Sequence, residues 1–419
     1  MSPDRSSSPP LRPPRIAMVS MHSSPLAGAG RGDAGGMNVA ILSVAEQLAA
    51  RGATVELLTR SEGPAQISTV APGVTLYELQ VGPPGPLPKE RLAEVVDEFG
   101  EAVAILTGRS APRYDIIHAH YWLSGLAVLP VALELGIPLV ESFHTVAALK
   151  NATRDIGQPA ESERRVMTEM FLAGQVSAIV AGSAAEATAL IDLAKAPADR
   201  VWVVPPGVDL DRFRPAQTDT APDDDGSRLR ASLSIPTDRH ILAVVARIQP
   251  LKDQELAIRA LALLPADRPV LVIAGEATPG EEGYLERLRS LTAELGVADD
   301  VRFVGALDRP AVAALLASAS LTVIPSRSET FGIVALESAA SGTPVVAFRG
   351  SGLVESVADG VSGVLVPSRE PQEWADAIAL LLGDPSRLTE LSSTARHHAE
   401  AFGWAATAAS LLGLYASLR

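Results

Sequence analysis

The sequence predicts an α/β protein built from two doubly wound, Rossmann-like domains that face each other across a cleft. Short runs rich in β-branched residues alternate with longer segments of helical periodicity, which is typical of parallel sheets covered by helices on both faces. This alternation stops at a polar segment near the middle of the chain and then starts again. The 419 residues are enough for two domains with full cores.

The first series of expected strands precedes residue 205. These strands are Arg15–Met21, Thr54–Thr59, Val74–Val81, Asp115–Ala119, Pro138–Phe143, Ala178–Ala181 and Val201–Val204. The helical patterns between them include Met37–Ala50, Lys89–Leu106 and Ser162–Leu172. Because helical patterns lie between most of these strands, we expect a parallel sheet with helices on both faces.

The second series of expected strands follows a break rich in Pro, Asp and Thr. Its strands are Ile241–Ala246, Pro269–Ala274, Val301–Val304, Leu321–Ile324, Pro344–Phe348 and Val364–Val366. The expected organisation is a disordered lead-in (1–14), a first domain (15–213), a linker (214–226), a second domain (227–400) and a last helix (401–419). No strand follows that helix, so we expect it to cross back onto the first domain.

Composition excludes several classes of function. The formal net charge of −14 argues against a nucleic-acid-binding protein, which needs a basic surface. The chain has no cysteine, which excludes disulfides and thiolate metal sites and favours a cytoplasmic protein. No apolar run reaches the length of a membrane span. The expected partners are small-molecule substrates. The sequence does not determine the oligomeric state; a homodimer through the first domain is expected only by analogy with such folds.

A glycine-rich loop lies between the first expected strand and the first expected helix, over residues 28–38. Glycines let the backbone approach a ligand closely, and the dipole of the following helix favours an anion. Gly30, Gly32 and Gly35 formally match a dinucleotide-binding fingerprint, but the second strand ends on Thr59-Arg60 without the acidic residue that this fingerprint requires. The loop therefore favours a phosphate or a sugar, while dinucleotide binding and a purely structural loop stay open as alternatives.

Two pairs of charged residues lie at strand ends of the second domain. Arg247 and Lys252 follow a buried strand, where a guanidinium and an ammonium together suit one diphosphate. Glu329 and Glu337 are separated by seven residues, and we expect a helix to begin near Phe331, with Glu337 about two turns inside it. Two such carboxylates can hold different hydroxyls of one extended ligand. The alternative for each pair is a solvated surface role.

Three histidines also end strands. His144 follows a strand and is expected to point into the cleft, while His118 and His120 share one face of another strand. Two histidines on one face of a strand can bind a metal ion together, but for His118 and His120 we favour a role in the core or in ligand contact. No metal site is predicted. The acidic run 223–225 lies in the expected linker and is interpreted as solvated.

The combination of the Gly35-Gly36 loop, Arg247-x4-Lys252 and Glu329-x7-Glu337 resembles glycosyltransferase family 4 over nearly the whole chain. That family has the GT-B fold and transfers sugars with retention of configuration. Residues 32–39, 118–125, 144–151, 161–165 and 402–408 are similar to the branch of the family that serves mycothiol biosynthesis. That branch transfers N-acetylglucosamine from UDP-GlcNAc to 1D-myo-inositol 3-phosphate.

The resemblance implies a role for each matching residue. Arg247 and Lys252 would bind the UDP diphosphate, Glu337 the ribose and Glu329 the donor sugar. The donor site would also include Gly36, Phe331, Gly332 and the backbone around Arg302. The acceptor side would be formed by Asn38, Lys89, Tyr121, Thr145 and Arg165, of which the last four would hold the inositol phosphate.

The resemblance also implies a mechanism without a metal cofactor. The departing β-phosphate would be stabilised by Arg247, Lys252 and a helix N-terminus, His144 would orient the sugar, and the acceptor would attack the same face. Glu329 as a covalent nucleophile is the alternative. Other acceptors also stay open, including those of sucrose- and sucrose-phosphate-synthase-like enzymes and glycan or glycolipid acceptors, as does a non-catalytic nucleotide-binding protein.

Overall fold

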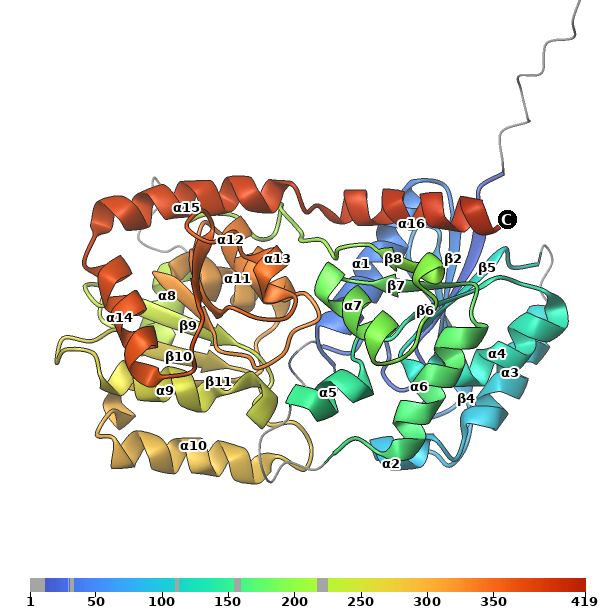
Figure 1. Cartoon of the computed structure of the whole chain (residues 1–419), viewed down its shortest axis with the longest axis horizontal. Coiled ribbons are helices and arrows are strands. Elements are labelled where there is room, and N and C mark those ends of the chain that lie inside the picture. The colour runs from blue at the N-terminus through green and yellow to red at the C-terminus, as the bar shows by residue number, and fades with distance from the viewer. Residues whose placement is uncertain (1–11, 29, 31–33, 110–112, 154–159, 217–224) are drawn as a thin grey trace, which may run out of the picture.

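The computed structural model describes residues 12–419 except 29, 31–33, 110–112, 154–159 and 217–224. It contains two α/β lobes side by side along the long axis of the molecule (Figure 1). Each lobe has one open sheet with helices on both faces. The predicted fold class is therefore confirmed.

The first sheet has the strand order β3-β4-β2-β1-β5-β6-β7-β8. Its strands are β1 (Arg15–Val19), β2 (Thr54–Ser61), β3 (Gln66–Ala71), β4 (Val74–Gln80), β5 (Ile116–His120), β6 (Leu139–Ser142), β7 (Ala178–Ala181) and β8 (Val201–Val203). Its helices are α1 (Gly36–Ala50), α2 (Lys89–Leu92), α3 (Val96–Arg109), α4 (Trp122–Leu135), α5 (Ala147–Thr153), α6 (Glu163–Gln175) and α7 (Ala184–Asp192). All neighbouring pairs are parallel except β3 with β4.

The second sheet has the order β11-β10-β9-β12-β13-β14, and all its pairs are parallel. Its strands are β9 (Ile241–Val245), β10 (Val270–Ala274), β11 (Val301–Gly305), β12 (Leu321–Ile324), β13 (Val345–Phe348) and β14 (Gly363–Val366). The helices that follow β8 in the chain are α8 (Asp225–Ser232), α9 (Gln254–Ala262), α10 (Glu282–Glu294), α11 (Arg309–Ser318), α12 (Ile333–Ala340), α13 (Leu353–Ser356), α14 (Pro371–Leu382), α15 (Pro385–Glu400) and α16 (Trp404–Leu418).

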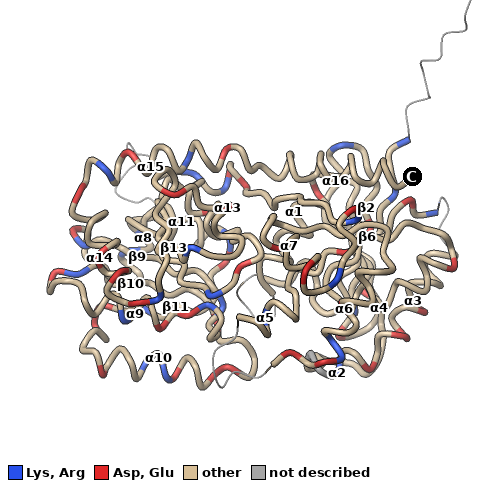
Figure 2. Tube along the Cα trace, viewed as in Figure 1, with Lys and Arg blue, Asp and Glu red and all other residues tan. Residues whose placement is uncertain are grey.

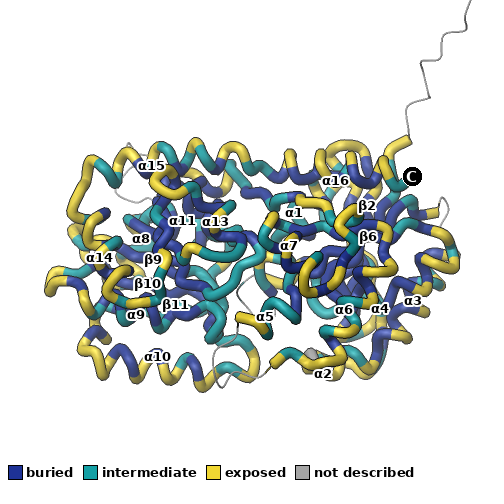
Figure 3. Tube along the Cα trace, viewed as in Figure 1, coloured by how far each residue is buried: buried dark blue, intermediate teal, exposed yellow. Residues whose placement is uncertain are grey.

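Strand alternation builds a core on each face of both sheets. In β1, Ala17 and Val19 belong to one apolar cluster, while Ile16 and Met18 belong to the cluster on the opposite face. The same division splits β9 between two clusters of the second lobe. Buried segments accordingly lie inside each lobe, and exposed ones follow the outer helices such as α10 (Figure 3). Lys and Arg are interspersed with Asp and Glu over both lobes (Figure 2).

Two local expectations were wrong. Strand β3 was not predicted, because it is a short edge strand with a largely exposed, polar sequence and therefore lacks a strong apolar signal. The expected helix Lys89–Leu106 is split into α2 and α3, which are separated by residues 93–95. Part of the expected linker lies outside the described residues, and α8 begins at Asp225 within it.

The C-terminal segment joins the two lobes. Helices α15 and α16 run in succession along one long side of the molecule, and α16 lies over the first lobe (Figure 1). In the short segment between α15 and α16, the carbonyl of Phe402 accepts a hydrogen bond from Val208 N–H at 2.7 Å. Trp404, Leu411 and Tyr415 of α16 pack into the same apolar cluster as α1. None of the helices in the described part of the chain is long and apolar enough to cross a membrane.

Candidate active site

A cavity of about 370 Å³ lies between the two lobes. It is lined by residues that follow the carboxyl ends of β1 and β5 in the first lobe and of β9 and β12 in the second. In each sheet, the chain leaves these neighbouring strands in opposite directions, so both strand pairs are topological switch points. Ligands of doubly wound sheets bind at such points. The two predicted strand-end sites therefore face one cavity.

The glycine loop brings the first lobe close to the second. Helix α1 begins at Gly36, and a Cβ atom on this glycine would lie 3.4 Å from Ile333 Cδ1. A Cβ atom on Gly35 would lie 3.8 Å from Arg247 Nε. The first N–H groups of a helix have no intrahelical acceptors and carry partial positive charge. The amino end of α1 and the Arg247 guanidinium therefore lie beside the same volume.

Asn38 has a different place from the one predicted. It is buried, and its Oδ1 accepts a hydrogen bond from Gly35 N–H at 3.0 Å, while Nδ2 donates to Ser23 Oγ and Ser24 O, both at 2.8 Å. Asn38 is not among the residues that line the cavity. Its amide holds the glycine loop in place.

The predicted basic pair and Glu329 come together on the second lobe. Arg247 and Lys252 follow β9, and both line the cavity. Lys252 Nζ lies 2.6 Å from Glu329 Oε1, and the Glu329 backbone N–H donates to Ser351 Oγ at 2.9 Å. The ion pair fixes the carboxylate of Glu329 beside the cation expected to bind a phosphate. Seventy-seven residues separate this pair in the sequence, so only the fold brings them together.

Helix α12 begins at Ile333, two residues later than predicted, so Glu337 lies little more than one turn inside it. Gly332 caps this helix at φ +94, a left-handed conformation that favours glycine, and a Cβ atom here would lie 2.7 Å from Leu353 Cδ2. Phe331 is buried, and both residues line the cavity. Glycine is therefore required to open α12 toward the cavity.

Glu337 has a partner that the sequence did not indicate. Its carboxylate is buried, and Oε1 accepts from Arg309 Nη2 at 2.6 Å. The Arg309 guanidinium also lies over the Phe213 ring, 4.7 Å from its centroid. A buried carboxylate needs such a partner. Arg309 lines the cavity as well, so the structure adds a third cation to this side of the site.

The three histidines form a stack beside the cavity, in which His118 and His120 are buried and His144 is half-buried. The rings of His118 and His120 have centroids 4.3 Å apart, and those of His120 and His144 lie 5.2 Å apart. His120 Nδ1 and His144 Nε2 are 2.9 Å apart, and His118 Nδ1 lies 2.7 Å from the Tyr415 hydroxyl. Burial lowers the pKa of His144 to about 4, so this side chain is neutral at pH 7. No cluster in the described part of the chain has the groups to hold a metal ion.

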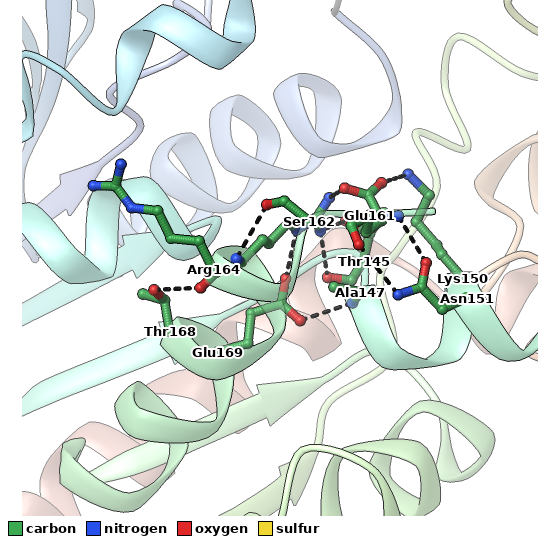
Figure 4. A network of polar contacts seen from close by, with 10 residues as sticks. Thr145, Ala147, Lys150, Asn151, Glu161, Ser162, Arg164, Thr168 and Glu169 are labelled. Atoms are coloured by element: carbon green, nitrogen blue, oxygen red, sulfur yellow. Dashed lines mark hydrogen bonds and ion pairs between the residues drawn. The ribbon is translucent and has the colours of Figure 1, made fainter. Parts of the chain in front are cut away.

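Three of the predicted acceptor residues are neighbours in the first lobe. The buried Arg165 donates from Nη2 to Thr145 Oγ1 at 2.8 Å, and its guanidinium lies 4.9 Å from the centroid of the Tyr121 ring. Tyr121 and Thr145 line the cavity, whereas Arg165 lies behind them. Arg165 also contacts Glu161 and Glu169 (Figure 4). The cluster is positioned by the amino ends of α4, α5 and α6.

Arg302 and Lys89 are the remaining predicted site residues. The Arg302 guanidinium donates to the carbonyls of Leu233, Asp299 and Val301, and it lies near the amino end of β11, whereas ligands bind at carboxyl ends. Arg302 is not among the residues that line the cavity, whereas Ala306, just beyond β11, is. Lys89 begins α2, but its side chain lies outside what the structure describes.

A direct contact between the lobes was missed by sequence reasoning. Ser183 Oγ donates to Thr330 O at 2.6 Å, beside Glu329. Glu355 of the second lobe accepts from the first N–H groups of α7, with Ala184 N 2.9 Å from Oε2 and Ala185 N 3.1 Å from Oε1. The only sequence signal was the Ser183 N-cap pattern, which says nothing about a partner 147 residues away.

Comparison with protein families matches both halves of the chain. Residues 35–207 match the glycosyl transferase 4-like domain, and residues 225–398 match glycosyl transferases group 1. The fold, the cavity and these matches define a glycosyltransferase with the GT-B architecture. This confirms the predicted enzyme class and favours glycosyl transfer over the dinucleotide-binding alternative.

Curated relatives narrow the assignment. The chain is 41% identical to D-inositol 3-phosphate glycosyltransferase of Acidothermus cellulolyticus, covering 97% of this chain and 91% of the relative. It is 40% identical to the enzyme of the same name from Mycolicibacterium smegmatis, covering 96% and 91%. The chain therefore belongs to glycosyltransferase family 4, in the group that contains these enzymes.

Solved structures agree with this placement. Sucrose-phosphate synthase from Thermosynechococcus elongatus superposes with a TM-score of 0.87 at 29% identity, covering 97% of this chain and 99% of that one. HepE of Anabaena, solved with UDP-glucose, superposes with a TM-score of 0.76 at 23% identity, covering 96% and 100%. The second likeness supports the fold alone.

Proposed function

We propose that this chain transfers N-acetylglucosamine from UDP-GlcNAc to 1D-myo-inositol 3-phosphate, with retention of the anomeric configuration. The observation that carries the proposal is the presence of cations on both sides of one cavity. Arg247 and Lys252 line it from the second lobe, while Lys150 and the Thr145–Arg165 pair lie on the first. An enzyme that joins a diphosphate donor to a phosphorylated acceptor needs one group of cations for each substrate. The names of the curated relatives support the same acceptor.

The donor would lie on the second lobe. Arg247 and Lys252 would bind the diphosphate, and the open amino end of α12 behind Gly332 would add its N–H groups. Glu337 would accept from the ribose hydroxyls through the oxygen that does not face Arg309. Glu329, held by Lys252, would bind the sugar. The second lobe thus supplies groups for each part of a nucleotide sugar, and these cations can neutralise the diphosphate without a metal.

The transfer step breaks the bond between the anomeric carbon and the β-phosphate oxygen, and forms a bond from that carbon to an acceptor oxygen. The departing phosphate gains negative charge, so Arg247 and Lys252 stabilise the transition state more than the bound donor. The acceptor hydroxyl attacks the same face, and its proton passes to the departing phosphate oxygen. Neutral His144 would orient the sugar. The ion pair with Lys252 favours a binding role for Glu329 over a covalent one.

The domain boundaries proposed for this enzyme are 15–213 for the acceptor domain and 227–400 for the donor domain, with 401–419 returning to the first. The absence of cysteine supports a cytoplasmic location.

The test is release of UDP from UDP-GlcNAc by the purified protein, with and without 1D-myo-inositol 3-phosphate. Release that depends on this acceptor, and not on unphosphorylated myo-inositol, would support the proposal, and the anomeric coupling constant of the product would show whether configuration is retained. Arg165→Met should then raise the KM for the acceptor without weakening UDP binding.

One other acceptor is favoured by a specific observation, the high similarity to sucrose-phosphate synthase. Fructose 6-phosphate, paired with UDP-glucose, is therefore the second combination to assay. Activity with this pair and none with the inositol phosphate would overturn the proposed function while leaving the family assignment intact.

A further inference from the structure

The acceptor side of the cavity contains a carboxylate between two cations. Glu161 accepts from Lys150 Nζ, and its Oε2 lies 2.9 Å from Arg165 Nη1 (Figure 4). Lys150 lines the cavity, and its side chain is 34% exposed, so it is accessible to a ligand. Arg165 is the residue that also donates to Thr145. Glu161 therefore occupies a position bounded by the same cations that an acceptor phosphate would need.

The backbone of Glu161 is held in place by the side chain of Asn151. Asn151 Oδ1 accepts from the Glu161 N–H at 2.7 Å, and Asn151 Nδ2 donates to the Glu161 carbonyl at 3.4 Å. Burial alone would raise the pKa of Glu161, but Arg165 and Lys150 outweigh it and lower this pKa. Glu161 is consequently ionised at neutral pH and lies where its negative charge meets both cations.

The two cations, Lys150 and Arg165, are already neutralised before an anion binds. Arg165 also contacts Glu169, whose second oxygen accepts from Ala147 N–H at 2.7 Å. Two cations thus face two carboxylates. Glu169 is fully enclosed and tied to the backbone, whereas Glu161 is 23% exposed. A phosphate that approaches Lys150 and Arg165 meets the negative charge of both carboxylates, and Glu161, as the more exposed of the two, is the one that can leave.

We propose that Glu161 is an internal counter-anion, that the phosphate of the acceptor displaces it, and that Lys150 then becomes a phosphate-binding residue. This inference rests on the proposed function, because it takes the acceptor to be phosphorylated. It adds Lys150 and Glu161 to the residues that determine acceptor specificity. An unphosphorylated sugar cannot replace the charge of Glu161, so the exchange favours phosphorylated acceptors over neutral ones.

The test is calorimetric titration of the full-length protein with 1D-myo-inositol 3-phosphate and, separately, with inorganic phosphate. Glu161→Gln keeps the size and hydrogen-bonding atoms of the side chain but removes its charge, and should tighten binding of both by at least about tenfold. Lys150→Met should weaken both by about tenfold, while the affinity for UDP stays unchanged. Glu163→Gln, an exposed neighbour at the start of α6, is the matched control and should have no effect.

Unchanged or weaker binding in Glu161→Gln, with an unaltered melting temperature, would overturn the inference, because Glu161 would then only brace Arg165. Unchanged binding in Lys150→Met would remove Lys150 from the phosphate site. The proposed function can fail independently of this inference, which happens if the wild type transfers no sugar to the inositol phosphate. In that case, tighter binding of inorganic phosphate by Glu161→Gln than by the wild type still supports the displacement of Glu161. Equal affinities of the two proteins for inorganic phosphate still refute it.

Discussion

The buried carboxyl of Glu186 predicts a specific dependence of stability on pH. Glu186 lies in α7, lines the cavity and is 4% exposed. Its Oε2 accepts from Gly182 N–H at 2.7 Å, while Oε1 has no hydrogen-bond partner among the described residues. Burial raises the pKa of this carboxyl from 4.5 to about 7, and the single backbone hydrogen bond offsets this only in part.

The sign follows from proton linkage. Below pH 4.5 the carboxyl is protonated in both the folded and the unfolded chain, so its burial contributes no ionisation penalty. As the pH rises toward 7, the unfolded chain loses this proton first, and the folded state becomes less stable relative to it. At about 1.4 kcal/mol per pH unit, the rise in the Glu186 pKa from 4.5 to about 7 corresponds to a loss of about 3 kcal/mol that is complete above pH 7.

Glu186→Gln keeps the acceptor for Gly182 but cannot ionise. We expect its free energy of unfolding to exceed that of the wild type by about 3 kcal/mol more at pH 8 than at pH 4.5. Urea denaturation of the ligand-free protein at both values measures this, and Glu134→Gln, an exposed glutamate in the same lobe, is the control. A difference between Glu186→Gln and the wild type that does not change with pH would refute the reasoning.

Three further predictions concern the second lobe. Arg247→Ala should lower kcat by about 100-fold or more, because a group that stabilises the departing phosphate contributes about 3 kcal/mol. Steady-state kinetics with saturating donor measures this effect, and an unchanged kcat would exclude Arg247 from stabilising the departing phosphate. Arg309→Met should leave the buried carboxylate of Glu337 without its cation, which lowers the free energy of unfolding by about 2 kcal/mol and weakens UDP binding. Urea denaturation measures the first effect and calorimetry the second. If neither value changes, the ion pair between Arg309 and Glu337 is dispensable. Glu355→Ala removes two acceptors from the amino end of α7 and should cost about 1 kcal/mol, whereas Glu355→Gln keeps one carbonyl acceptor and should lose less than the alanine variant; equal unfolding midpoints for wild type and alanine variant would contradict a stabilising contact between the lobes.

Much of the fold was predictable because its signals are local. Each strand of a buried parallel sheet is an apolar run, and each covering helix has its own periodicity, so their alternation indicates the doubly wound architecture without knowledge of contacts. Strand β3 escaped because an exposed edge strand has no buried face to mark it. The division of the segment 89–106 into α2 and α3 was also missed, and no local signal in the sequence marks this break.

The candidate site was predictable to the extent that its residues follow strand ends. Arg247, Lys252, Glu329 and His144 do so, and all four line the cavity. Arg302 does not line it, because this residue lies near the beginning of its strand, away from the carboxyl ends at which the cavity is found. A position along the chain does not by itself say which end of a strand faces a ligand.

By itself, the sequence determined the two-lobed α/β architecture, the glycine loop before α1 and the charged residues that close β9 and open α12, because these depend on patterns spanning a few residues. Only the tertiary structure decided which charges meet. The residues of each ion pair, Lys252 with Glu329, Arg309 with Glu337 and Lys150 with Glu161, come from different segments of the chain. The energy of an ion pair depends on distance and burial, and neither quantity is present in the order of residues along a chain.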